Sequence, residues 1–106
     1  MVFQYDELKA YVKEDFERFY RMGFQGEQIF PAVMDEYRHG EDFCSTENIC
    51  IHIFLVLNYV QKGLNANKVV EYLRQLLTEE SACLVKSDLG DEYPNYITDL
   101  KEIFCV

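Results

Sequence analysis

Glu36 and His39 stand at the spacing with which helical bundles bind metal. The E-x-x-H pair puts both side chains on one face of a helix, where it supplies half of the ligand set of a di-iron carboxylate bundle. The other half is missing, because the second histidine, His52, has Ile49 instead of a carboxylate three residues before it. The sequence therefore predicts no di-metal site.

The cysteines do not indicate a zinc site either. The chain has four of them, Cys44, Cys50, Cys83 and Cys105, without a paired C-x-x-C spacing. Cys50 and His52 lie about 200° apart around a helix and cannot converge on one ion. We expect reduced thiols in a reducing compartment, and we interpret His52, in the most apolar segment, as a hydrogen-bonded core residue.

The residues required for nucleophilic catalysis or phosphate binding are also missing. None of the three serines, Ser45, Ser81 and Ser87, lies in a G-x-S-x-G sequence, and capping of predicted helix ends accounts for them. The five glycines are isolated from one another, so the sequence has no glycine-rich phosphate loop. We therefore expect a binding protein without catalytic residues, metal or cofactor, and not an enzyme.

Acidic residues are concentrated in two short segments. The net charge of the chain is −9, and residues 35–47 and 79–92 each hold five acids and one basic residue, hence −4 each. Concentrated patches attract a basic protein partner and repel nucleic acid and anionic lipid. The predicted partner-binding residues combine these acids with neighbouring aromatic anchors: Asp35, Glu36, Tyr37, Glu41, Asp42, Phe43, Glu47, Asp88, Asp91, Glu92 and Tyr93.

Hydrophobic periodicity and helix-ending residues predict an all-α protein. We expect five or six helices in one compact domain over residues 1–106. The apolar run of residues 49–60 is too short to span a bilayer and suits a buried core helix. The predicted helices cover residues 4–22, a segment ending at Gly40, a segment from Ser45 or Thr46 to Gly63, a segment capped by Asn65, residues 79–89, and a last segment beginning at Pro94.

A shift of forty residues aligns the first two predicted helices with the third and fourth. Gly23 and Phe24 then fall on Gly63 and Leu64. Each half reads as a helix, a glycine stop, an apolar residue and a second helix, which is typical of an αα-hairpin. The pattern indicates either a repeat of two packed hairpins or a similarity that any two helical hairpins would show, since a solenoid needs more copies.

The stretch from Gly23-Phe24 through Ile29, Ala32-Val33, Glu36-Tyr37 and Glu41-Asp42 to Gly63-Leu64 resembles small immunity proteins of bacterial polymorphic toxin systems, including contact-dependent growth inhibition. The resemblance covers residues 8–80. It implies a small helical protein of the cytoplasm that binds a cognate toxin domain one to one, often a nuclease, and blocks it.

Two other classes of protein remain open at this point. A helical adaptor or regulatory subunit would use an apolar surface more than the acidic residues. A small metal-binding or catalytic bundle would need ligands beyond the Glu36–His39 pair. The first residues lack the basic start and apolar run of a signal peptide, in keeping with a cytoplasmic protein.

Overall fold

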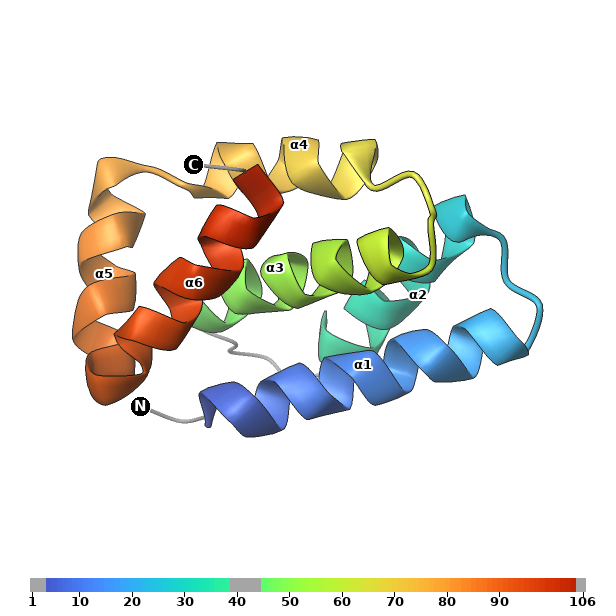
Figure 1. The fold of residues 1–106 in the computed structure, drawn as a ribbon, viewed down its shortest axis with the longest axis horizontal. Coiled ribbons are helices and arrows are strands. Elements are labelled where there is room, and N and C mark those ends of the chain that lie inside the picture. The colour runs from blue at the N-terminus through green and yellow to red at the C-terminus, as the bar shows by residue number, and fades with distance from the viewer. Residues whose placement is uncertain (1–3, 39–44, 105–106) are drawn as a thin grey trace.

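The computed structural model describes residues 4–38 and 45–104 of the chain. This part forms one all-α domain of six α-helices and one turn of 3-10 helix (Figure 1). The elements are α1 (Tyr5–Arg21), α2 (Gly26–Arg38), α3 (Ser45–Gln61), α4 (Asn67–Leu76), α5 (Glu79–Leu89), η1 (Gly90–Glu92) and α6 (Tyr93–Phe104).

Helix α3 lies at the centre of the fold because it is apolar on nearly every side. All of its residues from 49 to 56 are buried, as expected of a core helix and not of an amphipathic surface helix. The helices α1, α4, α5 and α6 pack around it, and α2 packs against α1 (Figure 1). The apolar run of residues 49–60 therefore lies in a core helix, as predicted. Among the described helices, none combines the length and apolar character needed to cross a membrane.

The α1–α2 and α3–α4 pairs form the two predicted hairpins, and they share one turn geometry. Gly23 and Gly63 have φ angles of 93° and 70°, a left-handed conformation that glycine adopts readily at a helix C-terminus. In each turn the next residue donates its N–H to the carbonyl five residues earlier, at 3.1 Å from Phe24 and 2.9 Å from Leu64. The shift of forty residues therefore relates two copies of the same helix-ending motif.

Helices α4 and α6 begin one or two residues away from their predicted first residues. Ala66 occupies the N-cap position of α4, and Asn65 acts just before it, where its Oδ1 accepts the N–H of Asn67 at 2.8 Å. Helix α6 begins at Tyr93 and not at Pro94, because η1 leads into it and Tyr93 already has helical angles (φ −55°, ψ −41°).

The buried face of α6 also differs from the prediction. The spacing in the sequence predicts four apolar residues on the inner face of this helix, but they are only half-buried: Ile97, Leu100, Ile103 and Phe104. Tyr96 and Asp99 lie deeper, with exposed fractions of 3% and 6%. The innermost contacts of this helix therefore include a carboxylate, whose partners come from α1.

Candidate functional site

Side chains from three helices gather around Tyr37, near the end of α2. The hydroxyl of Tyr37 interacts with the carboxylate of Asp15 on α1. Burial raises the pKa of Tyr37 well above its usual value, and the nearby charges of Asp15, Glu47 on α3 and Glu36 raise it further. These four residues, Asp15, Glu36, Tyr37 and Glu47, are called the Tyr37 cluster below. Three of them belong to the predicted site, and the structure adds Asp15.

Arg18 compensates only part of the negative charge of the Tyr37 cluster. Its guanidinium lies 3.1 Å from the carboxylate of Asp15 and 3.1 Å from that of Glu36. Within the described part of the chain, Glu47 makes no salt bridge. Burial raises the pKa of Asp15 and that of Glu47. The cluster thus combines three carboxylates with one guanidinium and remains negatively charged at neutral pH.

The raised pKa values predict a pH-dependent contribution to stability. Since Asp15 and Glu47 bind protons more readily in the folded chain, their contribution to stability is present at low pH. It is lost as the pH rises through the interval just above their ordinary pKa values of 3.8 and 4.5. In an NMR titration, we expect both carboxyl groups to titrate above these values. The variant Asp15→Asn/Glu47→Gln should lose this part of the pH dependence of unfolding, whereas unshifted titration would contradict the partial burial of the cluster.

The second acidic segment meets the first at the start of α3. The Oγ1 of Thr46 donates to Oδ2 of Asp88 at 2.5 Å, and Thr46 is fully buried. Thr46 therefore connects α3 to the end of α5. It does not cap α3, so the prediction of Thr46 as the N-cap is wrong. The next residue, Glu47, belongs to the Tyr37 cluster. Acidic residues far apart in sequence thus converge on the first turn of α3.

The other predicted partner-binding residues differ in exposure. Asp35 and Asp91 are exposed, and Glu92 and Tyr93 are half-buried. The ammonium of Lys86 lies 5.9 Å from the centroid of the Tyr93 ring. This arrangement favours a cation–π contact. Among these predicted residues, the second segment therefore presents the exposed Asp91 beside the hydrogen-bonded Asp88, and the ring of Tyr93 follows it. Glu41, Asp42 and Phe43 lie outside the described residues.

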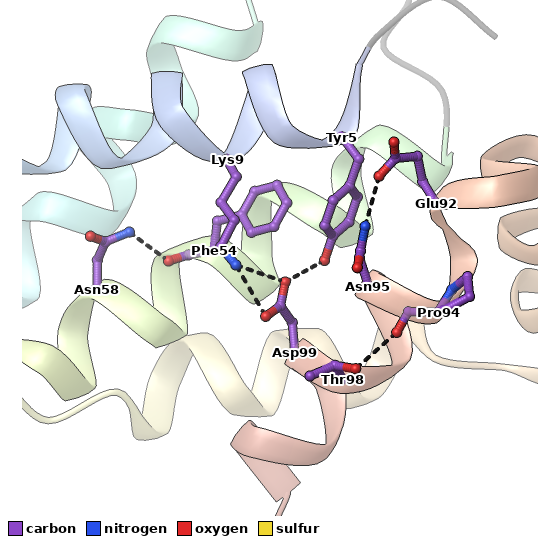
Figure 2. A network of polar contacts seen from close by, with 9 residues as sticks. All are labelled: Tyr5, Lys9, Phe54, Asn58, Glu92, Pro94, Asn95, Thr98 and Asp99. Atoms are coloured by element: carbon purple, nitrogen blue, oxygen red, sulfur yellow. Dashed lines mark hydrogen bonds and ion pairs between the residues drawn. The ribbon is translucent and has the colours of Figure 1, made fainter.

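A second polar group connects α6 to α1 (Figure 2). The carboxylate of Asp99 accepts a hydrogen bond from the hydroxyl of Tyr5 at 2.6 Å, and Nζ of Lys9 lies 3.0 Å from its Oδ2. Burial and this hydrogen bond raise the pKa of Tyr5. Because Tyr5 is 1% exposed and Asp99 6%, these groups position two helices and are not open to a substrate. Sequence reasoning missed Asp99, although it shares a helix face with Tyr96 and Ile103.

His52 is a core residue, as predicted. Its Nδ1 lies 2.8 Å from the carbonyl oxygen of Asn48, and the ring of Phe30 packs edge-on against it at 5.4 Å between centroids. In the described ranges, no group of three or more His, Cys, Asp or Glu residues is arranged to hold a metal ion. His39, the partner of Glu36 in the E-x-x-H pair, lies outside those ranges, as do Cys44 and Cys105.

The fold and the site together define a small all-α protein with an acidic cluster where α1, α2 and α3 meet. Comparison with known proteins finds no match among family models, curated proteins or solved structures. The functional argument therefore depends on the chemistry of the residues described above.

Proposed function

We propose that the protein is an immunity protein that binds a basic toxin domain, a nuclease, and neutralises it by forming a one-to-one complex. The observation that supports this proposal most directly is the Tyr37 cluster. It presents carboxylates from three helices around one aromatic ring. A nuclease binds phosphates through basic residues, and an acidic surface of this kind complements them in charge.

The raised pKa values of the cluster support a role in binding. A carboxylate with a raised pKa is destabilised in its charged form by the fold around it. Such groups are typical of functional sites, although structural networks also produce them. An arginine or lysine of the partner would compensate the charges of Asp15 and Glu47, and the ring of Tyr37 would supply an apolar contact beside them. The cluster thus fits a cationic partner better than a neutral one.

The proposed interface extends from the Tyr37 cluster in two directions. Along the sequence, Glu41, Asp42 and Phe43 connect the two helices that carry Tyr37 and Glu47. Across the Thr46–Asp88 hydrogen bond, the interface continues to the second segment with Asp91, Glu92 and Tyr93. In such an interface the aromatic rings would be buried at the centre, and the acidic residues around them would form a charged rim.

In this proposal the protein acts in the cytoplasm, without enzymatic activity, cofactor, nucleic acid or membrane. It blocks the active cleft of the toxin or a neighbouring site by occupancy. A helical adaptor without a toxin partner is the second candidate. The groove between α1, α3 and α6, which has an apolar floor, favours it, because an adaptor would bind through an apolar surface.

A titration tests the blocking mechanism. The protein is added in steps to the active toxin domain encoded beside it, and residual toxin activity is measured. We expect inhibition to be complete at a molar ratio of one, because a stoichiometric blocker acts only while bound. Complete inhibition at a hundredth of the toxin concentration would indicate an enzyme that modifies the toxin. Absence of binding to the toxin would contradict the immunity function itself.

A further inference from the structure

A groove with a volume of about 520 Å³ opens between α1, α3 and α6. Its shape follows from the Lys9–Asp99 ion pair, which connects α1 to α6 at one end of the groove (Figure 2). From there α6 runs diagonally toward α4, while α1 continues along α3 (Figure 1). The two helices diverge and form the walls, and the C-terminal half of α3 is left as the floor.

The floor of this groove is an uncovered part of a core helix. Val60 lines it with an exposed fraction of 64%, beside the half-buried Leu57. Residues 49–56 of the same helix are all buried. A helix that is apolar on nearly every side is expected to be covered along its whole length. The groove therefore marks the place where α3 lacks a neighbour within the described chain.

The two walls carry opposite charges. Lys13 lines the groove from α1, and Glu102 lines it from α6 next to Ile103. Neither Lys13 nor Glu102 makes a salt bridge with another described residue. An apolar floor with a basic wall on one side and an acidic wall on the other is complementary to itself. In a two-fold symmetric contact, each basic wall would meet the acidic wall of the other copy.

We propose that this face binds a second copy of the chain as a symmetric dimer. Val60 and Leu57 of the two copies form the apolar centre of the contact. Lys13 of each copy pairs with Glu102 of the other, which gives two equivalent ion pairs. The contact completes the burial of α3, and this burial supplies the stabilisation, because exposed ion pairs contribute little.

The size of the groove makes the dimer weak. Nine of the described residues line it, whereas a stable protein interface has about 20–30 residues on each side. We expect a dissociation constant on the order of 10–100 μM, typical of small transient interfaces. Each copy has a net charge of −9, so the copies repel one another, and added salt should strengthen the dimer by screening this repulsion.

The proposal is independent of the proposed toxin binding. On α1, Lys13 and Asp15 point about 200° apart around the helix axis, so the groove and the Tyr37 cluster lie on different sides of that helix. One surface can be altered without the other. The response to salt also separates them, since binding of a basic toxin should weaken as salt rises.

Sedimentation equilibrium of the full chain from 10 μM to 1 mM tests the dimer. We expect reversible self-association that Val60→Glu weakens at least tenfold, because it places a charge at the apolar centre. Val60 is already exposed, so the variant should fold normally. Leu84→Glu is the control: it introduces the same charge at a residue of α5 that is 48% exposed, and it should change the dissociation constant less than twofold.

Exchange of the two wall charges gives the sharper test. Lys13→Glu and Glu102→Lys should each weaken the dimer, whereas the double variant Lys13→Glu/Glu102→Lys restores the reciprocal pairs at the net charge of the natural chain. We expect its dissociation constant to lie within twofold of the natural value. A chain that stays monomeric at 1 mM would overturn the proposal and leave the groove to another occupant. Self-association that is insensitive to Val60→Glu, or a double variant weaker than both single variants, would overturn it as well.

Discussion

The substitution Asp99→Ala is expected to lower the free energy of unfolding by about 3 kcal/mol, in the range typical of breaking a buried ion pair. The carboxylate is 6% exposed and satisfies both Tyr5 and Lys9. Its removal leaves the buried hydroxyl of Tyr5 without a partner, which costs about 1–3 kcal/mol. The side chain of Lys9 is 45% exposed and can return to water, so the loss stays at the lower end of the range.

Chemical denaturation with urea measures this effect. Tyr5→Phe removes only the hydroxyl and should cost about 1 kcal/mol. Glu102→Ala is the matched control on the same helix, because it removes an exposed carboxylate and should stay within about 0.5 kcal/mol of the natural chain. In a double-mutant cycle, Asp99→Ala and Lys9→Ala should cost less together than the sum of the two single changes. If Asp99→Ala costs no more than Glu102→Ala, the network does not hold α6 to α1.

Reversal of two charges in the Tyr37 cluster is expected to slow association with the basic toxin at least tenfold at low salt. The variant Glu36→Lys/Glu47→Lys places two positive charges where the proposal requires negative ones. Charges at an interface steer the encounter of two proteins, so the association rate is the most sensitive quantity. The fold should tolerate the change at Glu36, because this residue is exposed and its pair with Arg18 lies at the surface. At the half-buried Glu47 the substitution breaks no salt bridge with another described residue.

The control variant Glu7→Lys/Glu71→Lys reverses the same number of charges elsewhere. Both pairs of substitutions change the net charge from −9 to −5. Glu7 lies in the first turn of α1, as Glu47 does in α3, so the cost against the helix dipole is matched as well. Stopped-flow measurements at two salt concentrations should show the loss for the cluster variant and less than a twofold change for the control. Equal effects of the two variants would mean that only net charge matters.

The helices and the all-α class of the fold can be predicted from local patterns in the sequence. Leu8, Val12, Phe16 and Phe19 recur with the period of a helix; the first three are buried and Phe19 is half-buried. Gly23, Gly63 and Gly90 end helices where the pattern places the stops. These features are local, since periodicity and helix-ending residues act within one or two turns of the chain. A core helix over the apolar run follows from its composition together with the capping residues and the length of the segment.

Which polar residues share a site depends on how the helices pack, and local patterns do not predict it. Asp15 is an ordinary acid on an amphipathic helix until α2 brings Glu36 and Tyr37 to it, and α3 adds Glu47 near Tyr37. Thr46 suits a helix cap in sequence, but packing against α5 buries it and turns its hydroxyl toward Asp88. The physical reason is that a local pattern fixes the face on which a residue lies. Its partner across that face depends on how the helices cross, which contacts between distant segments determine.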